Sequence, residues 1–134
     1  MLGEVLYEEK GKVTGMRVVS VEGEIKVEID LQGRGKMQGV EETSVWTYWS
    51  KTRSDGSMRG EGKGYMTTKD GHVIGLIGNG AAAGANADGS VHYTGSIYFH
   101  TTSEKYASLN GKTGVHEYDV DAEGNTVLKV WEWK

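Results

Sequence analysis

Residues 54–80 read SDGSMRGEGKGYMTTKDGHVIGLIGNG and contain two signals that decide the fold. Asp55-Gly56 and Asp70-Gly71 each lie between segments of strand-like composition, and an acidic residue followed by glycine in that context is a strong hairpin signal. The same kind of signal recurs at Glu22-Gly23, Asp88-Gly89 and Glu123-Gly124. The spacing therefore predicts a succession of hairpins.

The segments between these turns predict eight strands. Residues 24–31 alternate apolar and charged side chains, which is typical of a half-buried strand. The expected strands are residues 12–21, 24–31, 39–53, 57–69, 72–83, 91–102, 113–121 and 125–134. Eight antiparallel strands can close and so remove both sheet edges. We therefore expect a single all-β domain over residues 1–134, an eight-stranded antiparallel β-barrel with one short helix.

The short helix is expected at residues 103–109. Ser103 is a suitable N-cap, and Asn110-Gly111 is a suitable stop. The chain has 21 glycines and no proline. Because glycine in strands marks bulges and close backbone approach, this composition predicts a strongly curved sheet.

Several functional classes are disfavoured by the sequence. Residues 72–84 resemble a dinucleotide-binding turn, but another turn and strand follow Gly84 where that motif needs a helix. The net charge of -4 argues against nucleic-acid binding. The four histidines form no metal-binding motif, and the chain has no cysteine. No membrane-spanning stretch or leader is visible, so we expect a cytoplasmic protein without cofactor, metal or membrane contact.

A candidate ligand site follows from two-residue pairing across Asp55-Gly56. That pairing places Trp49 opposite Gly62 on the inner face, together with Thr47 and, one hairpin further, Asn79. It also turns Glu41 inward, the candidate for a catalytic group. Polar groups among apolar ones are typical of a small-molecule site. The alternative is a solvated Glu41 at the barrel rim and an Asn79 that satisfies a bulge.

The strand over residues 91–102 has two possible inner faces. Hydrophobicity favours Val91, Tyr93, Ile97 and Phe99 as the inward stripe, whereas strict pairing turns Tyr98 and His100 inward as ligand contacts. If Tyr98 and His100 face outward, they form with Trp46 and Tyr48 an aromatic surface for self-association.

The glycine-rich segments GRGKMQG at 33–39, residues 54–66 and residues 70–80, followed by SLNGKTGVHEYDVDAEGN at 108–125, resemble the allene oxide cyclase-like barrels, especially bacterial members of unknown function. The resemblance spans about residues 30–133. Leu109, Gly111 and Gly114 are its most specific part, since that family has a leucine-glycine-glycine turn before the penultimate strand.

The resemblance implies an eight-stranded barrel with an apolar cavity, associated as a homodimer or homotrimer. Characterised relatives cyclise a lipid epoxide or guide radical coupling, largely by shaping the ligand. The proline and cysteine of the cyclase pocket have no counterpart here, and Glu41 is the one group that can be matched. Two classes remain: a barrel that binds a small lipophilic molecule and controls its conformation as a cyclase or isomerase, and a non-catalytic structural or assembly barrel.

Overall fold

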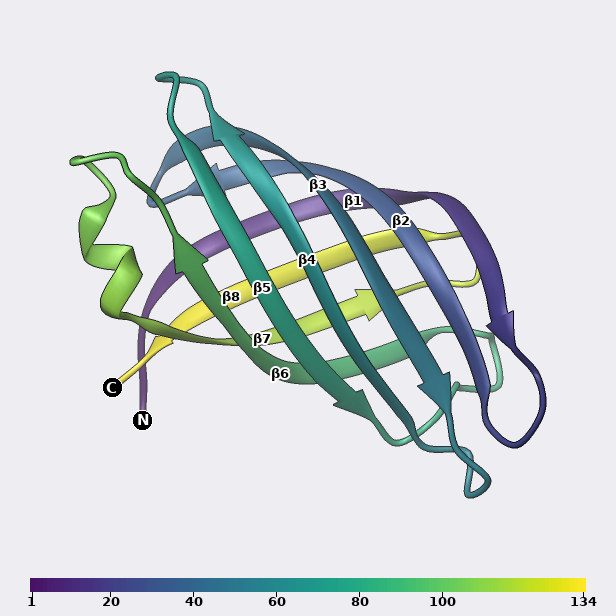
Figure 1. Ribbon diagram of the computed structural model, residues 1–134. Coiled ribbons are helices and arrows are strands. Elements are labelled where there is room, and N and C mark those ends of the chain that lie inside the picture. The colour runs from purple at the N-terminus through teal and green to yellow at the C-terminus, as the bar shows by residue number, and fades with distance from the viewer.

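The computed structural model covers residues 1–134 and shows a closed antiparallel barrel in which each strand pairs with its sequence neighbours and β1 pairs with β8 (Figure 1). The strands are β1 (Leu2–Ser20), β2 (Ile25–Met37), β3 (Val40–Thr52), β4 (Met58–Thr68), β5 (Val73–Ala82), β6 (Val91–His100), β7 (Thr113–Val120) and β8 (Asn125–Trp133). The predicted eight-stranded all-β barrel is confirmed. No helix in it has the length and apolar character of a membrane span.

The helical segment differs from the expected one. It is a single 3-10 turn, η1 (Ala107–Gly111), rather than a helix over residues 103–109. The expected cap is also absent, since Ser103 hydrogen-bonds the ring of His72 and no side chain caps the start of η1. The η1 segment lies at the end of the barrel where both chain termini lie (Figure 1).

The first hairpin is longer than the sequence patterns predicted. β1 begins at Leu2 rather than near residue 12, and β2 continues to Met37. β2 then turns into β3 through Gln38 and Gly39, whose φ angles of 47° and 82° are those of a two-residue turn that suits the strand twist.

Four hairpin connections share one geometry that sets the register of the barrel. In residues 53–57, the N–H of Arg53 donates to the carbonyl of Ser57, and the N–H of Gly56 donates to the carbonyl of Arg53. Gly56 has φ 88°, so the loop is a type I turn followed by a left-handed glycine. The same pairs of hydrogen bonds close residues 68–72, 86–90 and 121–125.

A three-residue loop shifts the pairing by one position from the two-residue turn assumed above, and such a shift exchanges the faces of a strand. Gly62 pairs with Tyr48, and Trp49 pairs with Glu61. Trp46 is therefore buried in the barrel, while the expectation that Trp49 points inward is wrong. On β5 the expected inner face is also exchanged: Ile74 and Leu76 are buried, and Ile77 is 64% exposed.

The face of β6 is the one that hydrophobicity favoured. Val91, Tyr93, Ile97 and Phe99 are buried, and Tyr98 is 48% exposed. β5 and β6 pair from Gly75↔His100 to Ala81↔Thr94, whereas the turn closes with Asn86 opposite Ser90. Residues 82–85 therefore hold one residue more than residues 91–93 opposite them, and this irregularity brings the apolar stripe of β6 inward.

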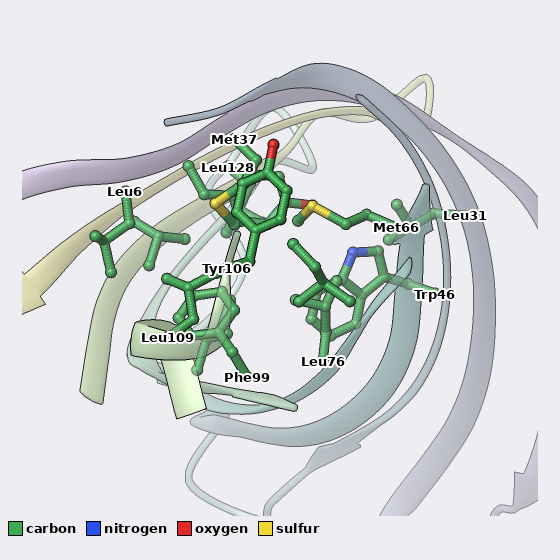
Figure 2. Packing of buried hydrophobic residues seen from close by; sticks show 14 residues of the cluster. Leu6, Leu31, Met37, Trp46, Met66, Leu76, Phe99, Tyr106, Leu109 and Leu128 are labelled. Atoms are coloured by element: carbon green, nitrogen blue, oxygen red, sulfur yellow. The ribbon is translucent and has the colours of Figure 1, made fainter. Parts of the chain in front are cut away.

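The packed core fills the end of the barrel that η1 covers. Tyr106 and Leu109 reach from the η1 segment into the same cluster as Met66 and Trp46 (Figure 2). The cluster has 14 buried residues and is closed off from solvent at this end, because Tyr106 is 1% exposed and Leu109 fully buried. The other end, toward the β3–β4 and β7–β8 turns, holds only a small cluster around Tyr93.

One of the two tightest strand approaches gives a test of the fold. A Cβ added at Gly35 would lie 1.9 Å from the carbonyl oxygen of Glu8, a backbone atom of the paired strand. We expect Gly35→Ala to force β1 and β2 apart and to lower the free energy of unfolding by roughly 1–3 kcal/mol or more, measured by urea denaturation. Gly111→Ala is the control, because nothing lies within 4 Å of its added Cβ. Equal stability of the two variants would contradict the described approach of β1 and β2.

Candidate small-molecule cavity

Glycines hollow the middle of the barrel. Gly60, Gly80 and Gly95 are direct neighbours on β4, β5 and β6, and this row is bounded by Ser50 on β3 and His116 on β7. In the adjacent row, Gly62 and Gly78 lie between Tyr48 and Ile97. Because strand residues of one row face the same side of the sheet, the wall of β4 and β5 is bare backbone at this level.

A partly open cavity of about 70 Å³ occupies this space. Its lining is mainly apolar and aromatic, with a few polar groups. The lining residues are Glu9, Leu31, Trp46, Tyr48, Gly60, Glu61, Gly62, Gly78, Asn79, Gly80, Tyr93, Ile97, His116, Tyr118 and Leu128. Trp46 and Leu128 also belong to the packed core, so the core forms one wall of the cavity.

His116 is held in one orientation and one tautomer. Its Nε2 lies 2.7 Å from the backbone carbonyl oxygen of Asn79, two strands away. The ring can cross β6 because Gly95 has no side chain between them. A carbonyl only accepts, so Nε2 carries the proton and Nδ1 has a free lone pair. Nδ1 is buried without a partner, and burial lowers the pKa of the ring, so His116 is neutral at pH 7 and presents an acceptor.

Three tyrosines line the cavity beside His116. The hydroxyls of Tyr48 and Tyr118 are 3.1 Å apart, and their rings meet edge to face. The Tyr93 hydroxyl lies 2.8 Å from Ser50 Oγ, and its ring lies against Tyr118. Burial raises the pKa of Tyr48 to about 12 and raises those of Tyr93 and Tyr118 as well. All three are neutral phenols at pH 7. In each of the two hydroxyl pairs one proton forms the mutual hydrogen bond, and the other is free to be donated to a ligand.

Two buried glutamates, one on β1 and one on β3, lie on either side of β2. Glu9 and Glu42 both flank Gly35 of β2, and they are 5% and 4% exposed. Ser44 Oγ donates to Glu9 Oε2 at 2.5 Å, whereas neither oxygen of Glu42 has a hydrogen-bond partner. A Cβ at Gly33 would lie 2.7 Å from the Glu9 carboxyl carbon, so glycine is what makes room for this group.

The surroundings of Glu42 favour its protonated form. Burial, and next the proximity of Glu9, raises the pKa of Glu42 to about 9, so Glu42 holds its proton at neutral pH. Burial, and next the nearby glutamates, raises the pKa of the neighbouring Tyr7 phenol above its usual value. The interior thus holds an acid, a hydroxyl-bound carboxyl group that faces the cavity, and a neutral phenol.

The structure places Glu41, Thr47 and Trp49 on the outside of the barrel. Glu41 pairs with Lys69 at 3.2 Å in solvent. Thr47 Oγ1 donates to Asp30 at 2.7 Å. The Trp49 ring lies under three cations, with Lys26 Nζ nearest at 4.8 Å from its centroid. The predicted inward placement of these three residues is wrong, since the three-residue turn exchanges the faces of β3.

Asn79, Tyr98 and His100 are also directed outward by their strands. The Asn79 side chain accepts a hydrogen bond from Ser96 Oγ at 3.1 Å on the outer surface, while its backbone lines the cavity and accepts from His116. Tyr98 and His100 are exposed. Trp46 and Tyr48, the expected outer companions of Tyr98, lie inside, so the aromatic surface predicted for self-association does not form in that composition.

Sequence reasoning missed Glu9, Glu42, Trp46, Tyr48, His116 and Tyr118. The expected first strand began after Glu9, and the wrong register concealed Glu42, Trp46 and Tyr48. The signal that could have found them is the repeated turn pattern, in which an acidic residue and glycine occupy the third and fourth of five residues. His116 had no local signal, because its partner Asn79 is 37 residues away.

The fold and the cavity define a class, a closed eight-stranded antiparallel barrel with a small, partly polar interior site. No protein-family model matches the chain, and no curated protein matches its sequence. Solved structures share the fold. A protein of unknown function from Clostridium acetobutylicum is 17% identical with a TM-score of 0.85, covering 98% of each chain. A conserved protein of unknown function from Rhodopseudomonas palustris is 14% identical with a TM-score of 0.82, covering 98% of this chain and 97% of that one.

A fungal structure also has this fold. An enzyme from Penicillium herquei is 22% identical with a TM-score of 0.69, covering 97% of this chain and 92% of its own. At these identities the matches establish that this is a β-barrel protein similar to bacterial barrels of unknown function, with an enzyme among its structural neighbours.

The buried acid predicts a pH dependence of stability. The pKa of Glu42 is about 9 in the folded state and about 4.5 when unperturbed. Its contribution to stability is therefore present below about pH 4.5 and is lost as the pH rises through about 9. Glu42→Gln keeps the shape of the side chain but does not titrate. We therefore expect the free energy of unfolding of the variant, measured by urea denaturation, to rise relative to that of the wild type by a few kcal/mol between about pH 5 and pH 9. Parallel pH profiles would contradict a protonated Glu42.

Proposed function

We propose that this protein binds a small organic molecule in the barrel cavity and controls the conformation of that molecule. The observation that carries the proposal is His116 Nδ1, a buried acceptor without a partner in the wall of a partly open cavity. A buried polar group normally has a hydrogen-bond partner, and one that lacks it in a cavity is suited to bind a ligand O–H or N–H.

The cavity sets the size of the ligand. Its volume of about 70 Å³ is well below the ~300 Å³ of sites for drug-sized molecules. A single water needs at least ~10–15 Å³ by such a measure, so the space suits roughly five to seven water-sized groups. This favours a small ring or the polar end of a longer molecule whose remainder leaves through the open side, and disfavours complete enclosure of a lipid.

The proposed action follows from the lining and from resemblance. The lining offers aromatic surfaces and few polar groups, which fix orientation and conformation, and fixing a reactive conformation can lower a barrier by several kcal/mol without a nucleophile. The allene oxide cyclase-like resemblance implies a cyclase or isomerase that works in this way. An enzyme among the structural neighbours supports the same direction.

Binding can be measured through the tryptophan in the cavity wall. A thermal-shift screen of small ring compounds with a hydroxyl or amine group supplies ligands, and their titration should quench the fluorescence of wild type and of Trp49→Phe but not of Trp46→Phe. His116→Phe keeps a ring and removes both nitrogens, so affinity should fall by roughly 3- to 10-fold.

His92→Phe is the matched control for the histidine. His92 is exposed and hydrogen-bonds Asp119 outside the barrel, so its replacement should leave affinity unchanged. A screen without ligands, together with native mass spectrometry that shows no co-purified molecule, would overturn the binding proposal.

Self-association is the second candidate function, and a specific feature favours it. The outer faces of β4, β5 and β6 carry Tyr65, Ile77 and Tyr98, each about half exposed or more. Ile77 and Tyr98 are paired neighbours, so they form one apolar area rather than scattered side chains. A homodimer or homotrimer through this face would fit a structural barrel, and native mass spectrometry distinguishes it from a monomer.

A further inference from the structure

We infer that the ligand of the cavity is a small organic cation, an amine that is protonated at neutral pH. This inference rests on the proposed binding function and specifies its chemical class. Four features of the cavity support it: its acidic residues, its aromatic residues, its unpartnered acceptor and its size.

The charged groups in and around the cavity are negative. Glu9 and Glu61 line it, and no lysine or arginine does. Glu61 is neutralised on the outer surface by Arg59 at 3.0 Å. Among the buried residues of the whole chain there are two glutamates and no lysine or arginine, so Glu9 has no buried lysine or arginine as a partner. Buried charges are normally paired, and a cation from outside would supply the missing partner.

Of the two buried glutamates, Glu9 is the one suited to hold the charge. It receives the Ser44 hydroxyl proton at 2.5 Å and lines the cavity, whereas Glu42 lies behind it without a donor. Glu9 is thus the carboxyl group that both has a donor within the protein and borders the cavity. A carboxylate with one hydroxyl donor still has free lone pairs for an ammonium group.

Four aromatic residues form part of the remaining wall. Trp46, Tyr48, Tyr93 and Tyr118 all line the cavity. Cations are attracted to aromatic faces, more strongly where water is excluded, and aromatic enclosures are the usual means of recognising ammonium groups. A carboxylate combined with several aromatic rings favours a cation over an equally sized neutral molecule and repels an anion.

The unpartnered histidine nitrogen is compatible with the same ligand. His116 Nδ1 accepts and does not donate, so an ammonium N–H satisfies it and a ligand carbonyl or carboxylate does not. Trp46 Nε1 is an unpartnered donor in the lining, and it can bind an acceptor atom elsewhere on the ligand. The volume of about 70 Å³ suits an ammonium group with a small ring or branched substituent.

The test compares probes of equal heavy-atom count and different charge: cyclopentylamine, cyclopentanol and isobutyrate, titrated into the purified protein at pH 7 by calorimetry. We expect the amine to bind about tenfold or more tightly than the alcohol, and isobutyrate to bind least. Glu9→Gln should reduce the affinity for the amine to that for the alcohol. Glu8→Gln is the control, because Glu8 is exposed on the outer face of the same strand and pairs with Lys129 at 3.3 Å, and it should change neither affinity.

Each outcome bears on the inference. Equal affinities of the amine and the alcohol in wild type would overturn the cation while leaving the binding function intact. An amine affinity that survives Glu9→Gln would overturn the role of that carboxylate and with it the argument. If none of the probes binds, the inference fails even when neutral compounds in the wider screen bind. The comparison in wild type decides the matter even if Glu9→Gln does not fold.

Discussion

The missing side chains of Gly60, Gly80 and Gly95 determine what the interior of this barrel can hold. An eight-stranded barrel is about wide enough to be filled by its own side chains, and at the η1 end this happens, with 14 residues packed around Trp46 and Tyr106. Further along the barrel axis, the row of glycines has no side chains that could fill the interior. His116 extends into that space, and its contact with the Asn79 carbonyl holds the ring in place. The hollow therefore depends on the packed end for its stability, since glycine in strands weakens them.

The architecture could be predicted from the sequence because its signals are local. Alternating side chains and acidic-glycine turns recur along the chain, and each needs only a few neighbouring residues to be recognised. The faces of β3 and β5 could not be assigned in the same way, because they depend on whether a turn has two or three residues. Asp55-Gly56 fits both turns by composition, and the hydrogen bonds of Arg53 with Ser57 and Gly56 show that the longer one forms.

The β6 strand was less affected by this ambiguity, and the reason is physical. Its stripe of Val91, Tyr93, Ile97 and Phe99 is so much more apolar than the alternate stripe that burial decides the face whatever the turn does. On β3 both stripes carry a tryptophan, so composition does not show which face of the strand points inward. Trp46 is buried, while Trp49 covers the outer surface beneath Lys26, Lys51 and Arg59, where a large ring is stabilised by cations.

The candidate site could not be predicted from local sequence patterns, because its polar groups come from β1, β3, β6 and β7 and meet only when the barrel closes. Two of them depend on glycine: Gly33 makes room for the Glu9 carboxyl group, and Gly95 leaves the space across which His116 reaches the Asn79 carbonyl. These glycines place acceptors where an apolar core would otherwise exclude them. Because Glu42 retains its proton, the interior avoids two adjacent negative charges. A barrel that only had to be filled would gain stability from apolar side chains in these positions, so the buried carboxyl pair and the empty glycine row together favour recognition over packing.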